Sequence, residues 1–320
     1  MNESIPETRM RRLDLAARAG WLYYIRGRTQ DEIATELNLS RQNAQRLVAQ
    51  AIGEGLIKFR LDHPLVRCIE LGQRLKDRFG LALCDVAPSA GGSEPNLAGV
   101  AERAGQLIET YLAPKSPQII AVGTGRAMLE SVRQVSSMTR PDHRIVSAVG
   151  NLRRDGRASA YDVGMRLADK IGGQCYPIPL PVITDSEGEC VILEAQRGYR
   201  VVRELFEKAN AVFTGVGSMN ESAPMFVDGF IDRHELKEMM DKGAVGEICS
   251  HAFDTAGEIV ETSITPRLTA FALQAAPARP TVFCASGAAK VAPLVAALKG
   301  RLANGLITDE WTATAMLERA

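Results

Sequence analysis

The sequence predicts an α/β protein in which a short helical module precedes a larger domain built on a doubly wound parallel sheet. Three observations support this fold class. The chain has 320 residues, about two ordinary domains' worth. Its character changes near residue 60, from short helices to apolar runs of strand length. From Leu81 onward those runs alternate with segments of helical period. We therefore expect a helical domain at 1–62, a connecting helix at 63–80 and an α/β domain at 81–320.

The composition excludes several classes of protein. It is 46% hydrophobic and 24% charged, which is unlike a disordered, collagenous or coiled-coil chain. The 38 basic and 38 acidic side chains balance, so contact with nucleic acid would need a local basic patch. No apolar run approaches the ~18 residues of a membrane span, and the first residues lack the apolar core of a signal peptide. We expect a cytoplasmic protein with no membrane partner.

Cysteine and histidine usage predicts no metal site and no cofactor. The six cysteines are scattered without a CxxC pair, and the four histidines form no HExxH motif. Most of these cysteines fall in apolar runs, where a reduced and buried thiol is the simplest interpretation.

The N-terminal module has the spacing of a helix-turn-helix. Gly27 ends a first helix, whose predicted inner face carries Leu13, Ala16, Ala17, Trp21 and Tyr24. Thr29 followed by Glu32 is a capping box that starts a second helix. After a tight turn, Ser40 caps a third helix. The inward residues of this third helix are Ala44, Leu47, Val48 and Ala51. This arrangement is typical of DNA-binding modules, although an ordinary three-helix packing unit is the alternative.

The outward side chains of the third helix are ones that read base edges. Arginine pairs with guanine acceptors, and glutamine or asparagine pairs with adenine. The following segment LIKFRL (56–61) alternates apolar and basic residues, which suits a winged hairpin touching phosphates. From Leu37 to Arg67 there are five basic and two acidic residues, a local charge of +3. The expected DNA contacts are Thr29, Gln30, Ser40, Arg41, Gln42, Asn43, Gln45, Arg46, Lys58 and Arg60. One such module binds weakly, so a symmetric oligomer reading two half-sites is expected.

A connecting helix is predicted between the two modules. From Pro64 to Phe79, apolar residues recur at helical spacing, including Ile69, Gly72 and Leu75. This stripe would either pack on its own domain or form a dimer contact.

The α/β domain is predicted from strict alternation. Strands are expected at 81–88, 118–125, 144–151, 174–182, 210–218 and 281–287, with shorter ones near 248–253, 259–261 and 268–273. Helices are expected at 94–113, 126–137, 159–172, from 183 to 209, at 235–242 and at 290–300. Three prolines in 174–182 indicate an edge strand or a strand end. Apolar strands alternating with helices imply a parallel, Rossmann-like sheet covered on both faces.

Several of these strands end in glycine where a helix begins. In an open α/β sheet the carboxyl ends of the strands form the ligand crevice, and glycine there lets backbone N–H groups approach an anion. Arg126 and Lys290 could add positive charge, while Asn151 and Asp254 could pair with hydroxyl groups. Simple turn chemistry is the alternative for each glycine alone. The third glycine of GxGxxG, a P-loop and a GxSxG elbow are all absent, so neither a dinucleotide nor a catalytic nucleophile is predicted.

The chain resembles the SorC family of bacterial sugar-responsive, DeoR-like transcriptional regulators. The matching segments are LYYIRGRTQDEIATELNLSRQNAQRLVAQAIGEGLIKFRL, AVGTGRAM, VSAVGNL, GVGS, GAVGEICSHAFD and CASGAAKVAPLVAALKGRLANGLITDE. The resemblance implies a winged helix-turn-helix joined to an effector domain related to sugar-phosphate isomerases, in a homodimer or homotetramer. It implies that the effector contacts Gly123, Thr124, Gly125, Arg126, Asn151, Gly217, Asp254 and Lys290.

The first glycine turn departs from the family pattern. Thr124 and Arg126-Ala127 stand where the family usually has an aromatic residue and a Thr or Ser. This leaves room for an unphosphorylated polyol or sugar, and the N-terminal block is similar to the branch that includes erythritol regulators.

These features predict a DNA-binding regulator of a carbohydrate or polyol catabolic operon, controlled by a small sugar, sugar alcohol or sugar-phosphate effector, and not an enzyme. Two alternatives stay open at this point. A sugar-phosphate isomerase or deaminase could use the same pocket, but it would need an acid/base set that the glycine turns do not supply. The large domain could also serve only to oligomerise a DNA-binding module.

Overall fold

The computed structural model describes residues 7–58, 66–88, 96–159 and 162–319. The chain divides into two compact units, Met1–Pro64 and Leu65–Ala320. Arg60 and half of the predicted wing, residues 59–61, fall outside the described residues.

The smaller unit consists of three helices, α1 (Glu7–Tyr24), α2 (Gln30–Glu36) and α3 (Arg41–Gly53). The capping box at Thr29 and Glu32 is present, and the Ser40 hydroxyl accepts a hydrogen bond from the N–H of Asn43. The predicted inner face of α3 is buried around Ala44. The tight turn before α3 places Asn38 at φ 54°, a left-handed conformation that asparagine tolerates.

The predicted inner face of α1 is partly wrong. Ala16 is fully buried, whereas Ala17 and Trp21 face solvent. The buried side of α1 instead includes Ala19 and Gly20, because the helix approaches α3 so closely that a Cβ on Gly20 would lie 2.8 Å from the Cβ of Ala51. Small residues, rather than the large aromatic one, therefore make the helix contact.

The larger unit alternates helices and strands. In chain order its elements are α4 (Val66–Phe79), β1 (Leu83–Ala87), α5 (Leu97–Leu112), β2 (Ile119–Val122), α6 (Arg126–Gln134), β3 (Arg144–Leu152), α7 (Val163–Ile171), β4 (Gln174–Pro181), α8 (Glu187–Glu194), α9 (Arg197–Glu207), β5 (Ala211–Thr214), β6 (Gly217–Ser218), α10 (Pro224–Val227), α11 (Arg233–Asp241), β7 (Gly246–Ile248), β8 (His251–Phe253), the 3₁₀ turn η1 (Thr265–Arg267), β9 (Thr281–Cys284), α12 (Ala288–Lys299), β10 (Gly305–Asp309) and α13 (Glu310–Arg319).

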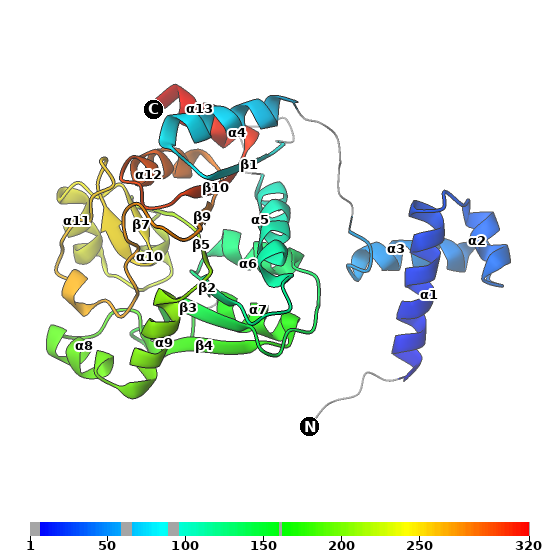
Figure 1. Cartoon of the computed structure of the whole chain (residues 1–320), viewed down its shortest axis with the longest axis horizontal. Coiled ribbons are helices and arrows are strands. Elements are labelled where there is room, and N and C mark those ends of the chain that lie inside the picture. Colours follow the sequence, from blue (N-terminus) through cyan, green and yellow to red (C-terminus); the bar gives the residue numbers. More distant parts are fainter. Residues whose placement is uncertain (1–6, 59–65, 89–95, 160–161, 320) are drawn as a thin grey trace. The chain divides into compact units, whose positions relative to one another are not determined.

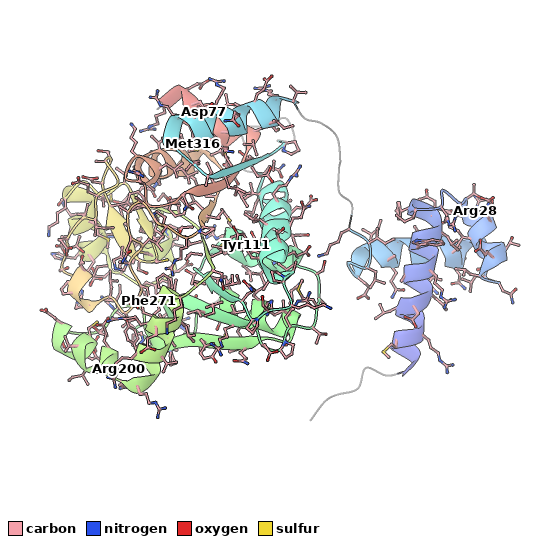
Figure 2. The ribbon with its side chains drawn as sticks, viewed as in Figure 1. Arg28, Asp77, Tyr111, Arg200, Phe271 and Met316 are labelled. Carbon is pink, nitrogen blue, oxygen red and sulfur yellow. The ribbon has the colours of Figure 1, made fainter. Side chains whose placement is uncertain are left out.

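The main sheet is parallel throughout the described residues, with strand order β1-β10-β9-β5-β2-β3-β4. Helices α5, α6 and α7 cover one face, and α9 and α12 cover the other (Figure 1). Figure 2 marks one aromatic residue from each face: Tyr111 packs against Phe213 on the α5 face, and Phe271 packs against Phe206 on the α9 face. The predicted doubly wound architecture is confirmed, and β4 with its prolines is an edge strand.

A second, antiparallel sheet was only partly predicted. Its order is β6-β7-β8, and β7 and β8 form a hairpin that overlaps the expected 248–253 segment and begins two residues before it. The prediction of strands at 259–261 and 268–273 is wrong. These segments make only isolated bridges, Phe253 with Ile259 and Ile183 with Leu268, because they run as irregular coil over the sheet.

Helix α4 belongs to the larger unit. It packs against β1 and α13 through Cys68, Leu71 and Leu75, and Gly72 lies against the carbonyl of Cys84. Ile69, which was expected in this stripe, is 66% exposed because the buried side is turned one position away.

Candidate functional site

A cavity of about 480 Å³ lies at the carboxyl ends of the central strands. The turns after β2, β5 and β9 form its floor. Its walls come from the α10 region, including Met225, Asp228 and Phe230, and from the β7–β8 hairpin. A cavity of this size is typical of a small-molecule site.

Two helices begin at the floor of this cavity. Gly125 is the N-cap of α6 with φ 111° and ψ 168°, and Gly287 is the N-cap of α12 with φ 106° and ψ 162°. This backbone region is essentially restricted to glycine. Neither helix has a side-chain cap, and the residues of both first turns, including Arg126 and Ala288, line the cavity. Uncapped N–H groups with the helix dipole behind them attract an anion or a ligand oxygen.

Opposite charges face this same space. Lys290 on α12 and Glu247 on β7 both line the cavity. Burial raises the pKa of the Glu247 carboxyl, an effect partly offset by the N–H of Ser250 and by Lys290. Burial likewise lowers the pKa of Lys290, which the charge of Glu247 opposes and the charge of Arg126 reinforces. Both groups are therefore poorly solvated at these positions and would gain from a polar ligand.

Further polar atoms at the site lack partners. The Ser286 hydroxyl lines the cavity and is buried without a hydrogen bond. Within the described part of the chain, no side chain accepts a hydrogen bond from the Lys290 ammonium. Buried polar groups are normally satisfied, so these atoms mark positions for ligand hydroxyl or anionic groups.

The β7–β8 turn holds two non-glycine residues in the left-handed region. Cys249 has φ 49° and Ser250 has φ 68°, and both line the cavity. Two-residue hairpins favour this twist, although glycine or asparagine usually supplies it. The turn is held by the Ser250 N–H donating to Glu247 Oε2 at 2.9 Å and by the contact of 3.0 Å between His251 Nδ1 and the Cys249 carbonyl. Glu247 is thereby fixed on the cavity wall by its own hairpin.

The structure brings most of the predicted effector residues together. The cavity is lined by Thr124, Gly125, Arg126, Gly217 and Lys290. Gly123 lies directly beneath it, where a Cβ would be 2.1 Å from Thr214 Oγ1. Gly217 is required for a similar reason, because a Cβ there would collide with the Glu247 carboxylate.

Two predicted residues are not part of the described cavity lining. Asn151 lies near the end of β3, the strand that pairs with β2, and its Oδ1 is buried without a partner. Asp254 uses its carboxylate inside its own turn, where Oδ1 accepts hydrogen bonds from the N–H groups of Ala256 at 2.9 Å and Glu258 at 3.0 Å. The carboxylate that the site does present is Glu247.

Sequence reasoning missed Glu247, Ser286 and the α10 residues. Glu247 had a usable signal, since it is the single charged residue in the apolar run from Ala244 to Cys249. Asp228 and Phe230 had none, because they reach the cavity through an irregular connection rather than a strand end.

On the smaller unit, the predicted DNA-contacting residues are not equivalent. Gln42, Gln45 and Arg46 are exposed on α3. Asn43 is half-buried, and its Oδ1 accepts a hydrogen bond from Arg46 Nη2 at 2.8 Å. Arg41 lies 3.5 Å from the Asp31 carboxylate in an exposed ion pair.

The remaining predicted contacts differ in their availability. The Thr29 hydroxyl is engaged in the capping box with Glu32, while the Ser40 hydroxyl caps α3. Gln30 is half-buried at the start of α2, and Lys58 is exposed. Ser40 lies at the end of α3 that carries Arg41, and Thr29 and Gln30 lie at the start of α2, where Asp31 pairs with Arg41. Lys58 instead follows the opposite end of α3.

The described residues contain no group of three or more His, Cys, Asp or Glu side chains that could hold a metal ion. Over the same ranges, no helix combines the length and apolarity needed to cross a membrane.

Comparison with known proteins places these features in context. A family model described as "Putative sugar-binding domain" matches residues 63–318. The erythritol catabolism regulatory protein EryD of Brucella abortus is 33% identical over 303 residues, covering 95% of this chain and 96% of that protein. The transcriptional regulator LsrR of an Enterobacter species is 31% identical over 312 residues, covering 96% and 94%.

A solved structure agrees with the fold. The full-length sorbitol operon regulator SorC from Klebsiella pneumoniae superimposes with a TM-score of 0.73 at 23% identity, covering 98% of this chain and 100% of that one. At this identity the likeness concerns the fold, and it extends over both units of the chain.

Proposed function

The chain belongs to the SorC/DeoR family of sugar-binding transcriptional regulators, and we propose that it controls a carbohydrate or polyol catabolic operon in response to a small sugar, sugar alcohol or sugar phosphate. Its relatives are transcriptional regulators and not enzymes. The N-terminal unit would bind the operator, and the larger unit would bind the effector. Operator binding would place its action in the cytoplasm, where bacterial DNA lies.

The two-sided cavity is the observation that carries this proposal. One side offers two uncapped helix N-termini and the Lys290 ammonium. The other side offers the Glu247 carboxylate, with the Ser286 hydroxyl nearby on the floor. A ligand with several hydroxyl groups can donate to Glu247 while its oxygens accept from the helix N-termini and Lys290. The printed name of one relative, which refers to erythritol catabolism, is consistent with such a ligand.

The DNA-binding half rests on the exposed face of α3. Gln42, Gln45 and Arg46 are exposed and could reach base edges, whereas Asn43 would act by positioning Arg46, whose guanidinium donates a hydrogen bond to it. The proposed phosphate contacts are Thr29, Gln30, Ser40, Lys58 and Arg60, and Arg41 would exchange Asp31 for the duplex. Because one module makes few phosphate contacts, a homodimer or homotetramer on two half-sites is part of the proposal.

The effector would act by binding two states of the protein unequally. A ligand shifts operator affinity only through its differential affinity for the DNA-competent and DNA-free forms. Lys290 and Glu247 sit on different elements, α12 and β7, so a ligand that joins them changes how these elements are held together.

The test combines ligand binding with operator binding. A thermal-shift screen of the full chain against tetritols, pentitols, hexoses and their phosphates identifies the effector, and an operator is selected from random duplexes. We expect Lys290→Met and Glu247→Gln to abolish the ligand-induced shift. Lys299→Met, which alters an exposed lysine at the far end of the same helix, should leave it unchanged. The proposal fails if no ligand of these classes changes either the unfolding midpoint or the operator affinity.

A further inference from the structure

The larger unit has a second cavity, of about 690 Å³, on the α9 face of the main sheet. It is lined by the C-terminal half of α9, by residues of the coil from Leu268 to Arg279, and by His251 at the start of β8. Among the described residues, it shares no lining residue with the cavity at the carboxyl ends of the strands, the effector cavity. Its volume lies within the range of small-molecule sites, and the proposed function makes no use of it.

Arg279 brings a poorly solvated positive charge to the second cavity. Its Nη1 donates hydrogen bonds to the carbonyls of Phe206 and Glu207 at the end of α9, and its guanidinium carbon lies 4.6 Å from the centroid of the Phe206 ring. No carboxylate in the described part of the chain forms an ion pair with it. Burial lowers the pKa of Arg279, and the charge of Glu207 offsets this effect only in part. A half-buried cation in this position gains from an anionic ligand.

His251 supplies a hydrogen-bond acceptor to the same cavity. Its Nδ1 lies 3.0 Å from the Cys249 carbonyl, and because a carbonyl only accepts, Nδ1 carries the proton. Burial lowers the pKa of the imidazole, which the Cys249 carbonyl and the charge of Glu261 oppose, so the ring is neutral near pH 7. Nε2 of this tautomer accepts a hydrogen bond, and no donor to it is found among the described residues. A ligand hydroxyl could fill that role.

The charges that line the second cavity leave a small positive excess. The described lining contains three basic and two acidic side chains, while His251 is neutral. Arg203 already pairs with Glu194 at 2.9 Å. The excess is therefore one positive charge, which Arg279 supplies from a half-buried position. A carboxylate balances that excess, whereas a phosphate group carries about −1.5 to −2 charges at pH 7.

Most of the other lining residues are apolar. The buried rings of Phe206 and Phe271 lie 4.8 Å apart between centroids, with an angle of 36° between their planes. Phe271, labelled in Figure 2, belongs to the coil, and Leu268 and Leu273 of the same coil extend the apolar wall. A ligand with an apolar body can bury that body here while its polar groups reach Arg279 and His251.

From these groups we infer that the second cavity binds a small amphipathic hydroxy monocarboxylate. The carboxylate pairs with Arg279, the hydroxyl donates to His251 Nε2, and the carbon skeleton packs on the two phenylalanine rings. This inference goes beyond the proposed function, because it adds a second class of ligand at a separate site.

The β7–β8 hairpin connects the second cavity to the effector cavity. Glu247 and Ser250 of this hairpin line the effector cavity, and His251 is the next residue. A ligand that fixes the His251 ring also fixes the Cys249 carbonyl to which that ring donates, and hence the turn. The two ligands therefore alter each other's affinity by the same factor. This regulatory consequence, unlike binding itself, rests on the proposed function.

Binding is tested by isothermal titration calorimetry of the full chain at pH 7.5 with 3-(4-hydroxyphenyl)propanoate. This probe combines a carboxylate, an apolar body and a donating hydroxyl. Two matched probes each lack one group: 3-phenylpropanoate has no hydroxyl, and 3-(4-hydroxyphenyl)propanamide has no charge. We expect the complete probe to bind, and the amide to bind at least about tenfold more weakly, because a hydrogen bond to a charged group is lost.

Substitutions then place the probe in the second cavity. Arg279→Met should weaken its binding by at least about tenfold, while Arg279→Lys, which keeps the charge, should retain most of it. Arg200→Met removes an exposed charge from the same helix α9 outside the cavity lining and should change nothing. His251→Asn keeps an N–H for the Cys249 carbonyl but loses Nε2, so it should weaken binding of the complete probe and leave 3-phenylpropanoate unaffected. Circular dichroism checks that each variant is folded.

Hydrogen exchange tests the link to the effector cavity. Saturating probe should slow exchange of the backbone amides of residues 246–253 in the wild type and not in Arg279→Met. The inference is overturned if the probe does not bind, if the amide binds equally well, if Arg279→Met binds like Arg200→Met, or if exchange in the hairpin is unchanged. These measurements use neither operator nor effector, so their failure leaves the proposed function standing, and loss of operator control would leave this inference standing.

Discussion

Glu235 on α11 connects three segments of the larger unit, and replacing it with Gln tests how its charge holds these segments together. Its Oε1 accepts hydrogen bonds from Arg154 Nη2 at 2.6 Å and from Arg267 Nη2 at 2.7 Å. Its Oε2 accepts from the N–H of Asp232 at 2.9 Å, within a capping box. The loop after β3, helix α11 and the turn η1 therefore meet at one nearly buried carboxylate.

The expected loss of stability follows from these contacts. Gln can keep the hydrogen bond to Asp232, but it lacks the charge that both arginines meet. Two charge-assisted hydrogen bonds are worth about 1.5–3 kcal/mol each, and the partial exposure of Arg154 reduces the sum. We expect Glu235→Gln to lower the free energy of unfolding by about 2–4 kcal/mol near neutral pH. That is a large part of the roughly 5–15 kcal/mol of a typical domain.

The pH dependence gives a second and more specific signature. Burial alone would raise the pKa of Glu235, but Arg154, the Asp232 N–H and Arg267 together hold it below its ordinary value of 4.5. A carboxyl whose pKa is depressed in the folded state adds stability above its unfolded pKa and loses it as the pH falls through the folded pKa. The difference between wild type and Glu235→Gln should therefore be full near neutral pH and shrink below about pH 4.5.

Urea unfolding measures this difference, with Trp311 fluorescence reporting the larger unit in a Trp21→Phe background. Asp241→Asn, which breaks an exposed ion pair with Lys237 on the same helix, is the matched control and should change stability little. The reasoning is refuted if Glu235→Gln is no less stable than the control, or if its deficit stays constant as the pH falls.

Three further predictions concern the two sites. Gly125→Ala should lower the unfolding midpoint, because an alanine at φ 111° is strained by about 1–3 kcal/mol. Gly188→Ala is the control and should not lower it, since a Cβ would also enter open space there but the residue is helical. Asn43→Ala should release Arg46 and reduce the ratio of specific to non-specific operator affinity, measured by fluorescence anisotropy, by up to about tenfold. Burial raises the pKa of the Glu247 carboxyl, so ionising it in the folded protein at higher pH lowers the stability of the wild type. Glu247→Gln has no carboxyl to ionise and should therefore gain stability relative to wild type as the pH rises, which thermal unfolding measured against pH tests.

Most of the main sheet could be predicted because its strands are short apolar runs bounded by turn residues. The strand β10 was not predicted, although all five of its residues are buried between β1 and β9. It passes directly into α13 with no intervening loop, and Asp309 both ends the strand and accepts a hydrogen bond from the Thr312 N–H. Because no turn residues separate β10 from α13, the hydrophobic pattern gives no signal for where the strand ends and the helix begins.

The long helical segment expected before residue 209 is two helices, α8 and α9, with Gln196 extended between them. Hydrophobic periodicity continues through this break, so composition alone could not place it. The segment from Leu268 to Leu273 was predicted to be a strand, but the structure has no strand there. Phe271 donates its N–H to the Ala148 carbonyl of β3, but Thr269 donates to the Val182 carbonyl, which follows β4, so the segment forms no ladder with either strand.

Only part of the effector cavity could be predicted from the residues at the strand ends. Glycines at the ends of β2, β5 and β9 predict a crevice, because parallel strands all end on one edge. The turns at that edge supply the two helix N-termini and Lys290, which attract anions. The buried Asp309 at the end of β10 is not part of the described cavity lining, and its carboxylate accepts hydrogen bonds from the N–H groups of Asn96 and Thr312. Glu247 comes from the antiparallel hairpin β7–β8, whose place beside the main sheet depends on tertiary contacts and not on local pattern.

The division of the cavity between two sheets also bears on how a ligand could act. Lys290 lies on a helix of the main sheet, and Glu247 lies on a hairpin whose turn holds two non-glycine residues in the left-handed region. Both charges are costly to keep buried, as their opposite pKa shifts indicate. A ligand that bonds to Lys290 and Glu247 at once would bind most tightly when the β7–β8 hairpin and helix α12 face each other as they do in this structure. Such a ligand therefore favours one arrangement of the two sheets, and that preference is the differential affinity that a switch requires.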